Sequence, residues 1–83
     1  MTDNERMFAR AIAPGMVTFP PGIHTKRFAR DMAFVAEHKP GCELSPKQAL
    51  YLRQVVVRYR RQIPADIVAA ARRELAELEA AAT

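Results

Sequence analysis

The sequence SPKQALYLRQVVVRYRRQI, residues 45–63, decides the fold of this chain of 83 residues. Ser45, Pro46 and Gln48 form a capping box with proline at the first helical position, which predicts the start of a helix. Apolar residues then recur at the i, i+3, i+4, i+7 spacing that buries one helix face. These residues are Ala49, Leu52, Val55, Val56, Tyr59 and Ile63. We therefore expect a long central helix over residues 46–62 in an all-α, single-domain bundle of three to four short helices.

The other face of this helix is positively charged. Its polar stripe consists of Lys47, Gln54, Arg58 and Arg61, with Tyr51 at the border. Arg53 and Arg60 form a second pair on the flank of the apolar face. Exposed helices normally mix both signs of charge to gain i,i+4 ion pairs, whereas residues 45–63 contain five Lys/Arg and no acid. We expect a surface that binds a nucleic-acid backbone or an acidic protein surface; an ordinary solvated face is the alternative.

The basic character of the chain is local. The net charge is +4, but the cations concentrate in residues 44–63 while residues 64–83 are net acidic. This distribution indicates a defined site and not a polycationic tail. The single cysteine, Cys42, excludes an internal disulfide and fits a reducing cytosol. No run approaches the ~20 apolar residues that cross a bilayer, and residues 1–8 do not resemble a signal peptide. We expect a cytoplasmic protein without a membrane partner.

Two helices are expected before the central one. Thr2 and Glu5 form a capping box for a helix over residues 3–13, which ends before Pro14-Gly15. The loop that follows is rich in proline and glycine. Its apolar residues are expected to pin it across the core, and residues 16–19 leave a short strand open as an alternative; these residues are Met16, Val17, Phe19 and Ile23.

The second helix is expected over residues 26–38, with Thr25 as its cap. Its apolar face consists of Phe28, Ala29, Met32, Val35 and Ala36. Lys26, Arg27 and Arg30 lie in its first two turns, where the helix dipole disfavours cations. Such a basic start suits a docked anion, with plain surface charge as the alternative.

A fourth helix is expected to open at Pro64, with Asp66 in its first turn. Its apolar face consists of Ile67, Val68, Ala71, Leu75 and Leu78. Residues 79–83 are expected to fray. This apolar face also offers a way to pair with a second copy, so the chain is expected to be a monomer or a homodimer.

Catalytic and metal sites find little support in the sequence. His24, His38 and Cys42 fall short of the four ligands of a structural zinc site, and no orienting group accompanies a Cys–His pair. The three glycines adjoin prolines as turn residues and form no phosphate loop. We therefore expect no enzyme activity, no metal and no other cofactor, with His38 near a helix end and Cys42 as a small apolar filler.

One segment resembles a known motif. The matching residues are Leu44, Ser45, Lys47, Gln48, Tyr59, Arg60, Arg61 and Gln62. They follow the pattern L-[ST]-x-K-Q, a hydrophobic helical stretch, then Y-R-[RK]-Q, which resembles small helical modules of phage and mobile elements beside or within helicases, primases and other DNA-processing proteins. The match covers about 20 residues of the chain. The resemblance implies a phage or prophage context, and therefore the host cytoplasm as the location.

Two function classes follow. The first is a nucleic-acid-binding accessory protein of phage DNA replication or recombination, with DNA preferred over RNA. In this hypothesis, the residues that contact phosphates are Lys47, Arg58 and Arg61. This row of phosphate-binding residues, the track, would be extended by Arg53 or Arg60 and by the cluster of Lys26, Arg27 and Arg30. Bases or sugars would be contacted by Gln54 and Tyr51. The second is a protein-binding, anti-CRISPR-like inhibitor of a host defence system; a scaffold acting through the fourth helix is a third. The linker KPGCELS, residues 39–45, is longer than a helix-turn-helix turn, so no sequence-specific readout is predicted.

Overall fold

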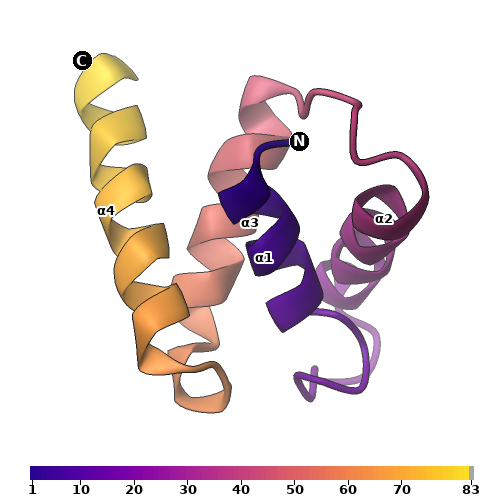
Figure 1. Cartoon of the computed structure of the whole chain (residues 1–83). Helices are drawn as coiled ribbons and strands as arrows, with labels where there is room; N and C mark the ends of the chain where they lie inside the picture. Colours follow the sequence, from indigo (N-terminus) through magenta and orange to yellow (C-terminus); the bar gives the residue numbers. More distant parts are fainter. Residues whose placement is uncertain (83) are drawn as a thin grey trace.

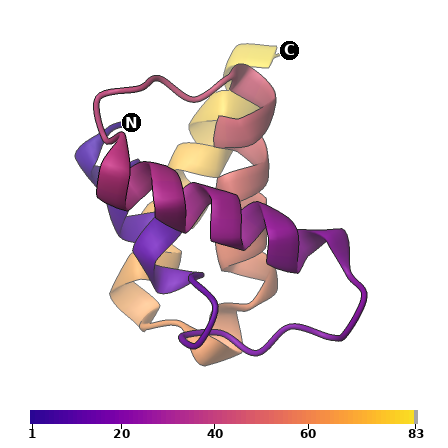
Figure 2. The same cartoon turned by 90° about the vertical axis from the view of Figure 1, so that its right-hand side faces the viewer.

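The computed structural model describes residues 1–82, which form a bundle of four α-helices (Figure 1). The helices are α1 (Asp3–Ala11), α2 (His24–His38), α3 (Pro46–Arg58) and α4 (Ala65–Ala82), with a 3₁₀ turn at Arg60–Gln62. α1, α3 and α4 run alongside one another, with α4 antiparallel to α3, and α2 crosses them (Figure 2). The expected all-α bundle is confirmed.

α3 begins as its sequence predicts. The Ser45 hydroxyl accepts from the Gln48 backbone N–H at 3.2 Å, and the Gln48 side chain accepts from the Ser45 N–H at 3.0 Å. The α-helix ends at Arg58, however, and not at residue 62. Because the proline ring disfavours helical geometry at the preceding residue, Ile63 is extended (φ −124°, ψ 141°). The chain therefore leaves the helix before Pro64, through the tighter 3₁₀ turn.

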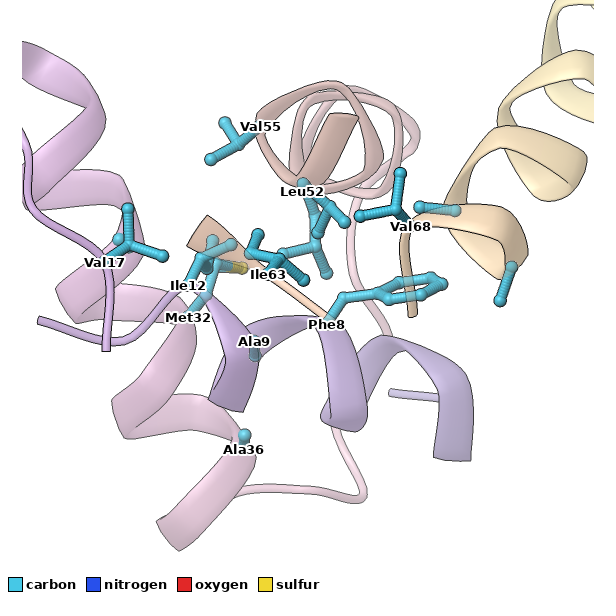
Figure 3. Close-up of a cluster of buried hydrophobic side chains, with 14 of the residues drawn as sticks. Phe8, Ala9, Ile12, Val17, Met32, Ala36, Leu52, Val55, Ile63 and Val68 are labelled. Atoms are coloured by element: carbon cyan, nitrogen blue, oxygen red, sulfur yellow. The ribbon is translucent and has the colours of Figure 1, made fainter. Parts of the chain in front are cut away.

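The core lies where the four helices meet (Figure 3). Phe8 from α1, Ile12 at its C-cap, Met32 from α2, and Leu52, Val55 and Val56 from α3 are at most 2% exposed. Ile63 and Val68 close the core beside α4. The apolar face predicted for the central helix is thus buried at Leu52, Val55, Val56 and Ile63, and half-buried at Ala49 and Tyr59.

The loop between α1 and α2 is held at defined points. Val17 and Phe19 are buried as expected, and the Phe19 ring meets Tyr59 edge-on with centroids 4.8 Å apart. Met16 is 67% exposed, so its predicted place in the core is wrong. Gly15 adopts a positive φ of 97° in the turn just before it. Within residues 13–23 the backbone forms one isolated bridge, Pro14 to Val17, and no strand.

A side-chain amide fixes this loop to the 3₁₀ turn. The Gln62 Oε1 accepts from the Thr18 backbone N–H at 2.8 Å, and the Gln62 Nε2 donates to the Thr18 carbonyl at 3.2 Å. This pair of hydrogen bonds satisfies both backbone groups of Thr18, as a neighbouring strand would. The end of α3 and the loop therefore form one unit.

α2 starts earlier than predicted. Its first residue is His24 and its N-cap is Ile23, so the expected cap at Thr25 is wrong. Thr25 is 2% exposed, and its hydroxyl lies 2.9 Å from the Tyr51 hydroxyl of α3. Thr25 thus links α2 to α3, because its hydroxyl forms a hydrogen bond with the Tyr51 hydroxyl and does not cap the start of α2.

α1 and α4 differ from expectation at their C-terminal ends. The capping box of Thr2 and Glu5 is formed, but α1 ends at Ala11 and not at residue 13. α4 remains helical to Ala82, so the fraying expected from residue 79 does not occur in the described part, and Thr83 lies outside it. On the apolar face of α4, Leu78 is 38% exposed.

Candidate nucleic-acid interface

The outer face of α3 presents a polar stripe to solvent. Lys47, Gln54 and Arg58 are exposed and, at about 100° per residue, fall within an arc of about 40° on the helix. No carboxylate of residues 1–82 forms an ion pair with Lys47 or Arg58. This part of the predicted stripe is therefore exposed and has no ion-pair partner among residues 1–82.

Arg53 does not belong to that face, so its predicted role in binding is wrong. It is 6% exposed, and its guanidinium donates to Glu5 Oε2 at 3.2 Å and to Glu74 Oε1 at 2.8 Å. It also donates to the Ala49 carbonyl at 2.8 Å and lies 5.6 Å from the centroid of the Phe8 ring. Arg53 thus joins α3 to α1 and α4. The charge looked uncompensated because both acids lie far from it in sequence.

The 3₁₀ turn places two further arginines at the end of the stripe. Arg60 and Arg61 are both exposed. Arg60 donates weakly to the Val57 carbonyl, at 3.4 Å. Since α3 ends at Arg58, Arg61 does not continue the straight helical stripe that its spacing predicted. The cations gather instead around the turn between α3 and α4.

Arg60 lines a hollow formed by the 3₁₀ turn, Ile63 and the first half of α4. The hollow has a volume of about 300 Å³, and Arg72 of α4 also lines it. Its other lining residues are Ile63, Ala65, Val68 and Ala69. Arg72 was not among the predicted site residues. The signal was present: Ala65, Val68, Ala69 and Arg72 repeat at i, i+3, i+4 and i+7 on one face of α4.

The three cations of α2 lie apart from the α3 stripe. α2 meets α3 through Phe28, whose ring contacts Tyr51 with centroids 4.6 Å apart. Lys26 and Arg30 each lie two residues from Phe28, and therefore about 160° away around the helix. All three cations are exposed, but Lys26 and Arg30 project from the side of α2 away from the Tyr51 contact. The predicted extension of the track onto α2 is therefore not assembled.

Tyr51 and Gln54, predicted to contact bases or sugars, have different surroundings. Tyr51 is half-buried, with its hydroxyl against Thr25 and its ring against Phe28. Both ends of its side chain are thus occupied by α2. Gln54 is exposed between the two cations of the stripe, so its amide is accessible to a ligand.

The residues of the L-[ST]-x-K-Q…Y-R-R-Q pattern divide by their contacts. Five have packing or hydrogen-bonding roles: Leu44, Ser45, Gln48, Tyr59 and Gln62. The remaining three, Lys47, Arg60 and Arg61, are exposed cations. The fold thus accounts for every polar uncharged residue of the pattern and leaves the cations to solvent.

The His and Cys residues considered as metal ligands form no cluster in the described range. Residues 1–82 contain no cluster of three His, Cys, Asp or Glu that could hold a metal. Cys42 is exposed, so its expected role as an apolar filler is wrong, and His38 ends α2 beside the Phe34 ring. Among the same residues, no helix has the length and apolar character needed to cross a membrane. Comparisons with protein-family models, curated proteins and solved structures find no match for this chain.

Proposed function

We propose that this chain is a nucleic-acid-binding accessory protein that acts through the outer face of α3 and the 3₁₀ turn after it. The observation that supports this proposal most strongly is the distribution of acidic residues around α3. Two carboxylates reach the helix from α1 and α4, and both are bound to Arg53. The binding surface comprises Lys47, Gln54, Arg58, Arg60 and Arg61, all exposed. An anionic polymer would remove the repulsion among its cations.

The side chains of this surface suit phosphate recognition. An arginine guanidinium presents a planar fork of donors that matches two phosphate oxygens, and Lys47 adds a point charge. Gln54 adds an amide that both donates and accepts hydrogen bonds. Phosphate contacts position a protein without reading sequence, so we propose weak sequence preference. The resemblance of residues 44–63 to phage modules supports a role in phage DNA replication or recombination, with DNA as the preferred ligand.

Fluorescence polarisation with labelled oligonucleotides tests this proposal. The chain is titrated into single- and double-stranded DNA at several salt concentrations. If four cations engage phosphates, log affinity should fall with log salt at a slope of about −3.6 for duplex and about −2.8 for single strands. An affinity independent of salt, or no binding at low salt, contradicts the proposal.

The structure supplies a charge-matched control. Arg58→Ala/Arg60→Ala/Arg61→Ala removes three exposed cations from the proposed surface, and Lys26→Ala/Arg27→Ala/Arg30→Ala removes three exposed cations from α2. The first triple variant should abolish binding at physiological salt, while the second should keep most of the affinity. Equal losses in both variants would mean that net charge, and not this surface, attracts the nucleic acid.

A further inference from the structure

The hollow between the 3₁₀ turn and the first half of α4 is lined by both charged and apolar side chains. Arg60 and Arg72 line its polar part, and four apolar side chains form the rest of its lining. Of these, Ile63 and Val68 belong to the core at 6% and 7% exposure, so this part of the wall is fixed by packing. The alanines, Ala65 and Ala69, leave the hollow open because they carry only a methyl group.

No acid lines this hollow. On α4, Asp66 lies two residues before Val68, and Glu74 lies two residues after Arg72. Asp66 lies about 60° from Ala69 around the helix, at the edge of the face toward the hollow, but does not line the hollow. A separation of two residues is about 160° around a helix, so Glu74 projects from the side of α4 opposite Arg72. Glu74 is held there by Arg53 and by the side-chain amide of Asn4. The guanidinium groups of Arg60 and Arg72 therefore form no ion pair with a carboxylate of residues 1–82.

The shape of the hollow distinguishes between two forms of nucleic acid. A duplex presents phosphates on a convex surface and keeps its bases stacked inside, so an apolar recess would stay empty. A single strand can turn a base outward, and proteins receive such bases on apolar side chains or on arginine planes. The recess has a volume of about 300 Å³. Its apolar side chains can contact the base of one nucleotide, and its two arginines can bind the phosphates on either side of it.

We propose that this hollow seats a base of a single-stranded nucleic acid, with the flanking phosphates bound by Arg60 and Arg72. This inference rests on the proposed function and specifies its ligand. The α3 stripe then binds the phosphates of the rest of the strand. The hollow raises the affinity for single strands above the affinity for duplex. The base is held by apolar contact and stacking, so the site accepts any base.

Two substitutions test the hollow, and the charge-removing one has a matched control. Ala69→Leu fills the recess without changing charge and keeps a good helix former on the exposed side of α4. Arg72→Ala removes one guanidinium, and Arg73→Ala removes the neighbouring one, which faces a different groove with Asp3 and Glu77. Affinity is measured by fluorescence polarisation for an oligo(dT) DNA strand, an oligo(U) RNA strand of the same length and a DNA duplex with the same number of phosphates. Circular dichroism melting confirms that each variant is folded.

The wild-type chain should bind the single strands more tightly than the duplex. Ala69→Leu and Arg72→Ala should each weaken single-strand binding about tenfold, which corresponds to the loss of one stacked base. Ala69→Leu should leave duplex binding nearly unchanged, because it does not alter the charge. Arg73→Ala should change neither. Equal affinity for duplex and single strands, or an Ala69→Leu variant that binds as wild type, would contradict the proposal that the hollow seats a base. Neither result would contradict binding at the α3 surface. Absence of binding to all three oligonucleotides contradicts both proposals.

Discussion

Arg53 and Arg60 lie seven residues apart in the same stretch of sequence, yet the fold treats them in opposite ways. Arg53 is 6% exposed and held by Glu5 and Glu74, where three helices meet. Arg60 is exposed beside a hollow that it shares with another arginine. An arginine therefore forms a buried ion-pair link between helices in one region and is a solvent-accessible cation in the other.

The difference between the two regions comes from where the acids lie. α1 and α4 bring their carboxylates to the middle of α3, and α4 brings an arginine to its end. The charge of Arg53 is thus compensated within the protein, whereas the cations of the turn after α3 have no ion-pair partner among residues 1–82. A buried cation is expected to matter for stability, and an exposed one for binding. The following predictions test that separation.

The largest effect is expected from a charge placed in the core beside Arg53. Val56→Asp puts a carboxylate at a position that is 0% exposed, one turn from Arg53 on α3. Arg53 already donates to two carboxylates and a carbonyl, so it does not compensate the new charge. An unpaired buried charge costs several kcal/mol, and we expect the domain to unfold. Far-ultraviolet circular dichroism should show loss of helix, and a native helical spectrum would contradict the assigned core.

Arg53→Ala is expected to have the next largest effect. It leaves Glu5 and Glu74 without the cation that they share, and removal of one partner of a buried pair costs roughly 3–5 kcal/mol. Because the side chain of Glu74 is 20% exposed, we expect the lower end, about 3 kcal/mol, in urea denaturation. Arg60→Ala is the control and should change the unfolding free energy by less than about 0.5 kcal/mol. Similar values for both variants would erase the distinction between the two regions.

A smaller effect is expected where the exposed region meets the rest of the fold. Gln62→Ala removes both hydrogen bonds to Thr18, at 2.8 and 3.2 Å. Since these bonds are exposed, their loss should cost about 1 kcal/mol in urea denaturation. The loop should also become more mobile, with faster amide exchange at Thr18. Unchanged exchange there would show that Val17 and Phe19 hold the loop without the amide.

The sequence predicted those features that depend on neighbouring residues. The capping boxes at Thr2 and Ser45 form because both partners lie within one helical turn. The spacing of Leu52, Val55 and Val56 was enough to find the buried face of α3. Local hydrogen bonds and periodicity therefore specified the helices and most of the core.

Features that depend on distant residues were missed. Arg53 pairs with Glu5 and Glu74, and Thr25 bonds to Tyr51, so neither contact can be read from local spacing. The early end of α3 also shifted Arg61 out of the stripe, because the chain must become extended before Pro64. Arg72 joins Arg60 only once α4 folds back along α3. Long-range packing thus decided which arginines are available.

The central claim is that binding is confined to the outer surface of α3, the 3₁₀ turn and the start of α4. Titration of the ¹⁵N-labelled chain with a single-stranded DNA oligonucleotide, followed by amide chemical shifts, tests it most directly. We predict saturable shifts between Lys47 and Arg72 that decrease at high salt, with little change along α2. Shifts centred on α2, or a spectrum unchanged at low salt, would contradict the claim.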